Sequence, residues 1–110
     1  MALRYTLYID QGSDYTVAFP VLNAANEPQD LAGWSARGQV RVVATDPVVL
    51  HDFTDELSLA GSDLTLTVPA AVSSTWMWSF AAYDIELTDP NGEVSRLVEG
   101  FLVVRPEVTR

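Results

Sequence analysis

Hydrophobic and polar residues alternate most regularly between Phe80 and Arg105. The alternating set is Tyr83, Ile85 and Leu87 against Asp84, Glu86 and Thr88. A period of two sends one set into a core and the other into water, as in a half-buried strand. The Asp89-Pro90-Asn91-Gly92 segment that follows has the residues of a tight hairpin turn. We therefore expect one long β-hairpin, with a bulge or a close backbone approach at Gly100 in the return strand.

The same alternation predicts further strands before this hairpin. We expect them over residues 3–9, 15–22, 34–43, 48–53 and 64–68, with another short stretch around Leu57 and Leu59. Turn residues separate them at 11–14, 23–30, 45–47 and 61–63. Pro20 cannot donate a ladder hydrogen bond, which marks the 15–22 strand as partly an edge.

Two of these strands carry informative faces. The first alternates Leu3, Tyr5, Leu7 and Ile9 against Arg4, Thr6 and Tyr8, with an aromatic on each face. One face of the 34–43 strand has Trp34, Ala36, Gly38, Val40 and Val42. In the second strand Arg37 and Arg41 fall on the other face. This pattern predicts a half-buried strand with a basic outer stripe.

Pro69 marks the start of the only plausible helix, because proline is favoured in a first helical turn. The residues that follow it are compatible with two turns, and Val68, Val72 and Trp76 recur at a spacing of four. We interpret this segment as a short crossover. The fold class we expect is all-β: an immunoglobulin-like antiparallel β-sandwich of about seven to eight strands, with one short helical crossover, as a single domain over residues 1–110.

Composition excludes several classes of partner. Fifteen acidic residues against six Arg and no Lys give a formal charge of −9, which makes nucleic acid a poor partner. The chain has no Cys, so it forms neither a disulfide nor a thiolate metal site. Residues 64–83 carry no charge over twenty positions, but Pro69 and several Ser and Thr residues favour buried soluble elements over a membrane span. No signal-peptide pattern follows the first residues.

The inventory of catalytic side chains is small. His51 is the only histidine, and there is neither a lysine nor a Gly-x-Ser-x-Gly motif. We interpret His51 as a strand surface residue beside Asp52, and Asp55-Glu56 as a solvated corner. Asp84 and Glu86 have the spacing of paired glycosidase carboxylates, but a solvated face explains them equally well. We predict that the protein is not an enzyme and has no catalytic residues.

Oxygen ligands for a cation occur once in the sequence, at Asp89, Asn91 and Glu93 around Gly92. The segment is shorter than a twelve-residue calcium-binding loop and lacks the bidentate acid that ends such a loop. A plain hairpin turn is therefore favoured over a calcium site. We expect no metal and no cofactor.

Aromatic residues are densest in the crossover. Trp78, Met77 and Phe80 are the candidate partner-binding residues, beside Trp76. Burial in the core is the alternative for this cluster, and stacking against a sugar is another. Because Trp76 continues the spacing of Val68 and Val72 into the core, we expect Trp78 rather than Trp76 to face a partner.

Several motifs resemble those of a known family. They are Gln11-Gly12-x-Asp14, the strand with Phe19, Pro28-x-Asp30-Leu31-x-Gly33, Arg37-x-Gln39-Val40-Arg41, Tyr83-Asp84-Ile85-Glu86-Leu87, Asp89-Pro90-Asn91-Gly92, Glu99-Gly100 and Arg105-Pro106-Glu107-Val108-Thr109. Together they are similar to the small β-sandwich proteins of tailed bacteriophages (LtfC-like), and to N-terminal domains of phage upper-baseplate proteins. The Trp-Met-Trp segment within residues 73–79 departs from that pattern, which usually has a small-residue helix there.

This resemblance implies a non-enzymatic virion structural or virion-associated protein, of the tail or baseplate, that acts as a protein–protein interaction module. It implies other virion proteins as partners, with a homo-oligomer possible, and localisation in the virion after synthesis in the host cytoplasm. It supplies no catalytic residues. The alternative function is a carbohydrate-binding β-sandwich module that uses exposed Trp residues.

Overall fold

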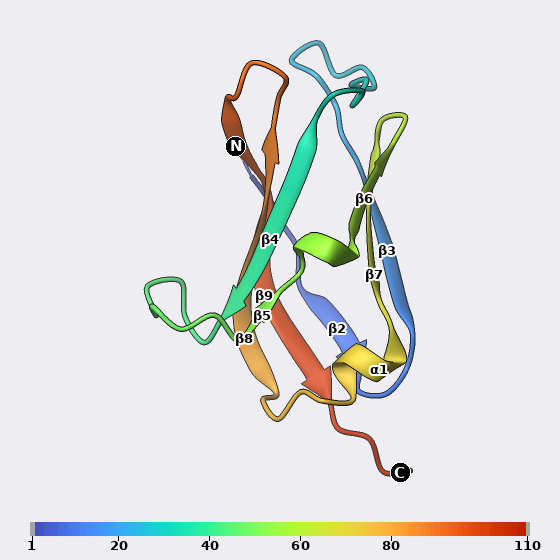
Figure 1. Cartoon of the computed structure of the whole chain (residues 1–110), viewed down its shortest axis with the longest axis vertical. Coiled ribbons are helices and arrows are strands. Elements are labelled where there is room, and N and C mark those ends of the chain that lie inside the picture. The colour runs from blue at the N-terminus through green and yellow to red at the C-terminus, as the bar shows by residue number, and fades with distance from the viewer. Residues whose placement is uncertain (1, 110) are drawn as a thin grey trace.

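The computed structural model describes residues 2–109, which form two β-sheets packed face to face (Figure 1). The larger sheet contains β1 (Leu3–Arg4), β2 (Leu7–Asp10), β4 (Ser35–Arg41), β5 (His51–Asp52), β8 (Phe80–Thr88) and β9 (Val94–Arg105). Its order is β1-β9-β8-β4-β5, and β2 also pairs with β9. The smaller sheet contains β3 (Tyr15–Pro20), β7 (Asp63–Val68) and β6 (Leu57–Ala60), in the order β3-β7-β6. The expected β-sandwich is confirmed, and β3 is an edge strand as Pro20 predicted.

Side chains from both sheets meet in one core. The fully buried members are Leu7, Ile9, Val40, Phe53, Leu64, Leu66, Val68, Ala81, Ile85, Val98 and Leu102. They come from five of the strands, β2, β4, β7, β8 and β9, together with Phe53 between β5 and the 3-10 turn η1 (Thr54–Glu56). The alternation read from the sequence therefore identifies the inward faces of β7 and β8 correctly, whereas it assigned no inward face to the apolar run of β9.

The β8–β9 hairpin is present as predicted. Its turn places Gly92 at a φ of 87°, a left-handed conformation that glycine adopts without steric cost. The register shifts between Ile85 and Glu86, which pair with Val98 and Arg96, so the extra residue of the bulge is Leu97 and not Gly100. Gly100 instead allows the close approach of another segment, because a Cβ atom there would overlap the backbone carbonyl of Tyr5.

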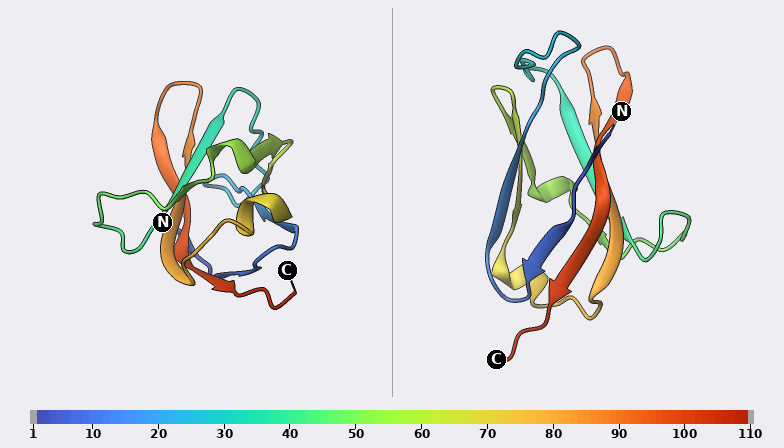
Figure 2. Two further views of the ribbon diagram at one scale, coloured as in Figure 1. Left: turned by 60° about the horizontal axis from the view of Figure 1, so that its bottom comes forward. Right: turned by 180° about the vertical axis from the view of Figure 1, so that it is seen from behind.

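The N-terminal segment differs from the single strand expected over residues 3–9. It forms two short strands, β1 and β2, and both run parallel to β9 (Figure 2). Leu3 and Tyr5 are 53% and 45% exposed, although Leu7 and Ile9 are fully buried. Leu3 lies in β1, the edge strand of the large sheet, and Tyr5 follows it directly in the break before β2.

Two predicted strand ends were also wrong. β4 ends at Arg41, so Val42 is 49% exposed instead of lying in the core. Of the predicted 48–53 strand, only His51 and Asp52 pair with β4. The loop between β4 and β5 projects from the sandwich (Figure 1) and leaves Val48 exposed.

The helical crossover is shorter than the two turns expected. α1 (Ala70–Ser73) is a single turn, and the hydroxyls of Ser74 and Thr75 donate to the carbonyls of Ala71 and Val72 three residues earlier. These side-chain bonds compete with continuation of the helix. Trp76 follows the helix and is buried, as its spacing predicted. Across residues 2–109, no helix has the length and apolar character needed to span a membrane.

Candidate functional site

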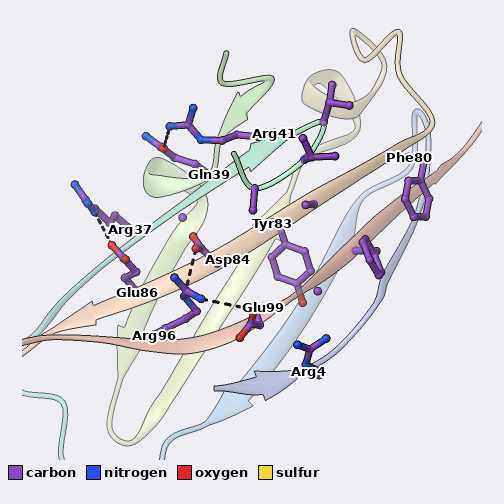
Figure 3. A pocket seen from close by; sticks show the side chains of 17 residues that line it. Arg4, Arg37, Gln39, Arg41, Phe80, Tyr83, Asp84, Glu86, Arg96 and Glu99 are labelled. Carbon is purple, nitrogen blue, oxygen red and sulfur yellow. Dashed lines mark hydrogen bonds and ion pairs between the residues drawn. The ribbon is translucent and has the colours of Figure 1, made fainter. Parts of the chain in front are cut away.

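A cleft of about 470 Å³ lies on the outer face of β4, β8 and β9, the side of the large sheet turned away from the core (Figure 3). The alternation of β8 places it there. Ala81, Tyr83, Ile85 and Leu87 of that strand are buried, so the residues between them point outward. We refer to this hollow as the outer cleft. One of its walls is formed by Val42, Val43 and Ala44, the first residues of the projecting β4–β5 loop.

One half of the outer cleft is apolar. Phe80 and Phe101 stack there with ring centroids 5.1 Å apart and an interplanar angle of 28°. Their side chains remain 56% and 50% exposed. The strand register explains the contact, because Phe101 pairs with Ala82, two residues beyond Phe80 on the same face. We define the apolar half as Phe80, Ala82, Phe101, Val42 and Val43.

The other half carries alternating charges. Nε of Arg37 lies 3.0 Å from a carboxylate oxygen of Glu86. Arg96 lies between Asp84 and Glu99, at 3.4 Å and 3.6 Å from their carboxylate oxygens. The Arg37–Glu86 and Arg96–Asp84 pairs join neighbouring strands across the solvent-facing surface, whereas Arg96 and Glu99 both belong to β9. Exposed pairs of this kind contribute little to stability, roughly 0–1 kcal/mol each, so folding alone does not explain why they gather here.

Two further arginines flank the cleft without a carboxylate partner. The guanidinium of Arg41 donates to the backbone carbonyl of Asp46 at 2.7 Å and to the side-chain oxygen of Gln39 at 3.0 Å. Within residues 2–109, no ion pair joins Arg4 or Arg41 to an acidic side chain. Both cations can therefore interact with an incoming group.

Asp84 is affected by both burial and neighbouring charges in this position. Partial burial raises the pKa of its carboxyl above the ordinary value, and the nearby Glu86 and Glu99 raise the pKa further. Arg96 opposes the shift without reversing it. The charged form of Asp84 would be stabilised by an additional cation or hydrogen-bond donor, and the cleft is open to receive one.

The charge of this face differs from that of the remaining chain. Four of the six arginines line the outer cleft together with three of the fifteen acids, a formal balance of one positive charge. The rest of the chain therefore carries two arginines and twelve acids. The basic outer stripe predicted for the 34–43 strand is confirmed by Arg37 and Arg41, which both line the cleft.

The predicted partner-binding residues are placed differently relative to the outer cleft. Phe80 lines the outer cleft, whereas Met77 and Trp78 do not. Met77 is 95% exposed. Trp78 is half-buried and stacks on Trp76, with ring centroids 4.7 Å apart and an interplanar angle of 25°, so one face of its ring is covered.

Phe101 was missed as a site residue. The sequence around it reads as a continuous apolar run of four residues, in which the outward and inward phases look alike. Phe101 and Leu102 must point to opposite faces, but only the pairing of Phe101 with Ala82 on β8 shows which of the two points outward.

His51 is not the surface residue expected beside Asp52. It is partly buried, with its Nε2 atom 2.7 Å from Oε1 of Glu56, and its ring packs edge-on against Phe53 and Trp76. Glu56 is correspondingly shielded, so the expected solvated corner is wrong at that residue. The cause is the 3-10 turn, which brings residue 56 back over residue 51.

Asp52 instead contacts the first residue of that turn. Its carboxylate accepts a hydrogen bond of 2.8 Å from the backbone N–H of Thr54. Hydrogen bonds from the side chain and backbone of Thr54 lower the pKa of Asp52.

The oxygen ligands considered for calcium close the hairpin turn. A single oxygen of Asp89 accepts hydrogen bonds from the backbone N–H groups of Asn91 and Glu93, both at 2.9 Å. Within residues 2–109 there is no group of three or more His, Cys, Asp or Glu side chains arranged to hold a metal ion.

Comparison with known proteins gives the fold. No protein-family model matches the chain, and no curated protein matches it. Among solved structures it is similar to a chicken TCR chain, described as "crystal structure of chicken TCR for 2.0", with a TM-score of 0.61 at 12% sequence identity. The match covers 98% of this chain and 56% of the TCR chain, so the protein spans about half of that chain's length. At this identity the likeness shows an immunoglobulin-like β-sandwich and nothing further about activity.

Proposed function

We propose that this protein is a non-enzymatic component of a tailed-bacteriophage particle, in the tail or baseplate, which binds other virion proteins through the outer cleft. The virion assignment is supported by the resemblance of its turn and strand motifs to the small phage β-sandwich proteins. The mode of action is supported by the cleft. The partner is expected to be a protein surface that offers apolar side chains beside acidic ones.

The observation that carries the proposal is the stacked pair Phe80 and Phe101. Two aromatic rings, each about half exposed, lie on the outer face of the large sheet where β8 begins. Leaving such area in water is unfavourable by roughly 25 cal/mol per Å², which a partner would recover on burying it. Aromatic and arginine side chains are also the residues that most often dominate binding energy at protein interfaces. The outer cleft combines both.

The experiment is co-purification with phage tail proteins. Tagged wild type and Phe101→Ala would be produced during infection, the particles isolated on a density gradient, and the bound chain quantified by mass spectrometry. We expect the wild type to sediment with particles and the variant to be depleted by about tenfold, the effect of losing a contact of roughly 1.4 kcal/mol.

The matched control is Val94→Ala. Val94 also lies on β9 and is 55% exposed, but it does not line the cleft. Its variant should bind particles like the wild type. Equal binding by all three proteins would remove the cleft from the proposal, and absence of the wild type from particles would overturn the virion assignment. Tail or head-assembly genes beside the gene would support the assignment independently.

A carbohydrate-binding module on the same fold is the alternative to this proposal. It requires a free aromatic platform, and Trp78 has one ring face covered by Trp76. Glycan-array binding that is lost in Trp78→Ala would favour the alternative. Retention of glycan binding by that variant would exclude Trp78 as the platform.

A further inference from the structure

We propose that Arg41 is a positioning residue for the outer cleft, because it holds the β4–β5 loop in the place where that loop forms a wall of the cleft. The inference rests on the proposed function in taking the outer cleft as the interaction surface. It goes further in naming the side chain that sets the shape of this surface before a partner binds. Arg41 does so through one loop residue, Asp46.

Apolar packing does not hold the middle of the loop. The ladder between β4 and β5 ends at Val40, so residues 42–50 lie outside it. Val42, Val43 and Val48 are 49%, 54% and 61% exposed. Leu50, at the far end of the loop, packs against the core. A segment with few buried apolar contacts opens at a low cost in free energy, so polar contacts must restrain the wall if it is to keep its shape.

Asp46 is the residue at which the loop is fixed. It is half-buried, whereas the other residues of 42–49 are exposed. Its backbone N–H donates to the carbonyl of Val43 at 3.0 Å, and its carboxylate accepts a hydrogen bond of 2.9 Å from the backbone N–H of Val48. Val43 belongs to the cleft wall. The position of Asp46 therefore determines where this wall lies.

Arg41 joins Asp46 to the sheet. Its Nη1 atom donates to the backbone carbonyl of Asp46 at 2.7 Å. Within residues 2–109, this is the one hydrogen bond that leads from residues 42–49 to another part of the chain. A hydrogen bond from a charged donor is stronger than one between neutral groups. A single charge-assisted contact thus ties the middle of the loop to the end of β4.

The guanidinium is itself oriented by the sheet. Its Nη2 atom donates to the side-chain oxygen of Gln39 at 3.0 Å, two residues earlier on the same face of β4 (Figure 3). The amide nitrogen of Gln39 donates in turn to the carboxylate of Asp52 on β5, at 3.3 Å. A row of polar contacts therefore runs from β5 through β4 to the loop, and Arg41 is its last member before Asp46.

The test is amide hydrogen exchange of the full chain without a partner, followed for each residue by NMR. In Arg41→Ala, the N–H groups of Asp46 and Val48 should exchange at least about tenfold faster than in the wild type, the effect of losing a hydrogen bond to a charged group. The amides of β7, which is paired on both sides, report opening of the whole fold. Their exchange should stay unchanged.

The matched control is Arg37→Ala. Arg37 lies on the same face of β4 and also lines the cleft, so its loss removes the same charge. Its side chain is 70% exposed and pairs with Glu86 instead of the loop. The loop amides of this variant should exchange at the wild-type rate. Faster loop exchange in Arg37→Ala equal to that in Arg41→Ala would overturn the inference, because loss of charge alone would then loosen the loop.

Arg41→Lys separates position from charge. Lysine keeps the positive charge but donates from one nitrogen, where the guanidinium donates from two. We expect faster loop exchange than in the wild type, and depletion from phage particles in both Arg41 variants. The inference requires particle binding to follow loop exchange among these proteins. Wild-type binding by a variant whose loop exchanges fast would overturn it, as would lost binding by a variant whose loop exchanges at the wild-type rate.

The outcome is separable from that of the proposed function, because exchange is measured without a partner. Unchanged loop exchange in Arg41→Ala would overturn the inference, as would equal acceleration in β7, while depletion of Phe101→Ala from particles would still support the proposed function. A wild type absent from particles would overturn the virion assignment. The exchange rates alone would then decide whether Arg41 positions the wall.

Discussion

The phenol of Tyr83 donates a hydrogen bond of 2.6 Å to the backbone carbonyl of Tyr5. This bond joins β8, in the centre of the large sheet, to the break between β1 and β2 at its edge. Gly100 lies against the same carbonyl and leaves it the space that a side chain would fill. The backbone N–H of Tyr5 donates to the carbonyl of Glu99 at 3.0 Å. Three contacts therefore fix the N-terminal segment where it changes from one short strand to the next.

Replacing Tyr83 by Phe should destabilise the protein by about 1–2 kcal/mol, because the carbonyl of Tyr5 would lose its partner in a partly buried position. Urea unfolding monitored by fluorescence measures the change. Tyr8→Phe is the control, since Tyr8 is 56% exposed. If the two variants have the same midpoint, the hydrogen bond does not contribute to stability.

A side chain at Gly100 should displace the segment that Tyr83 holds. Gly100→Ala is expected to cost roughly 1–3 kcal/mol through steric overlap with the backbone of Tyr5. The double variant with Tyr83→Phe should cost less than the sum of the two single changes, because the overlap already weakens the hydrogen bond that the second change removes. Additive free energies of unfolding would show that the two residues act independently.

Stability should fall at alkaline pH through the same tyrosine. Burial, with smaller contributions from Tyr15 and Tyr5, raises the pKa of Tyr83 above its ordinary value of 10.0. Above that pH the unfolded chain has lost a proton that the folded chain keeps, so the unfolded state binds fewer protons and stability decreases. The slope is about 1.4 kcal/mol per pH unit for one group. At pH values below 10.0, the contribution of the protonated Tyr83 to stability is fully present.

The pH dependence can be assigned to the residue by substitution. Between about pH 9 and about pH 11, Tyr83→Phe should lose less stability than the wild type, because its share of the proton release is gone. Burial also raises the pKa of Tyr15, so some alkaline sensitivity should remain in the variant. Unfolding free energies at several pH values for both proteins provide the comparison. Parallel curves would show that Tyr83 does not titrate on unfolding.

The hairpin turn offers a test of backbone strain alone. Gly92 has a φ of 87° and no atom within 4 Å of where a Cβ would lie. Gly92→Val should therefore cost roughly 1–2 kcal/mol from conformation and nothing from steric contact with neighbours. Asn91→Val, at the adjacent exposed position, is the control and should change the melting temperature little. A Gly92→Val melting temperature equal to that of the wild type would contradict the turn assignment.

Period-two alternation predicted the sandwich and its core because it depends on local geometry. The clean strands, such as the one with Leu64, Leu66 and Val68, were identified with the correct buried face. Turn chemistry located Gly92 for the same reason. The buried face of a strand and the turn at Gly92 are determined by residues close together in the sequence. A sequence pattern can therefore predict them.

The errors arose where distant residues decide the outcome. The break after Arg4 depends on Gly100 and Tyr83, and nothing local to the N-terminal segment signals it. The contact between His51 and Glu56 depends on a turn whose apolar anchor, Phe53, is buried in the core with its ring against that of Tyr83. The outer cleft was only partly predictable, because it requires the register that sets Phe101 beside Phe80.

The two tryptophans of the crossover should differ in their effect on stability. Trp76 is 5% exposed, contacts the ring of His51 and continues into the core, so Trp76→Ala should cost about 3–5 kcal/mol as a large-to-small core change. Trp78→Ala loses a stacked aromatic pair of roughly 0.5–1.5 kcal/mol together with some partly buried area. We therefore expect the second variant to remain folded at a lower melting temperature, where the sequence suggested almost no change.

Particle binding completes the comparison. If the outer cleft is the contact surface for virion proteins, Trp78→Ala should bind phage particles like the wild type because Trp78 does not line the cleft. Melting temperature and particle binding would be measured on both tryptophan variants under identical conditions. Equal destabilisation would mean that Trp78 supports the core as much as Trp76 does. A loss of particle binding in Trp78→Ala alone would return the contact surface to the crossover, as the aromatic pattern of the sequence first suggested.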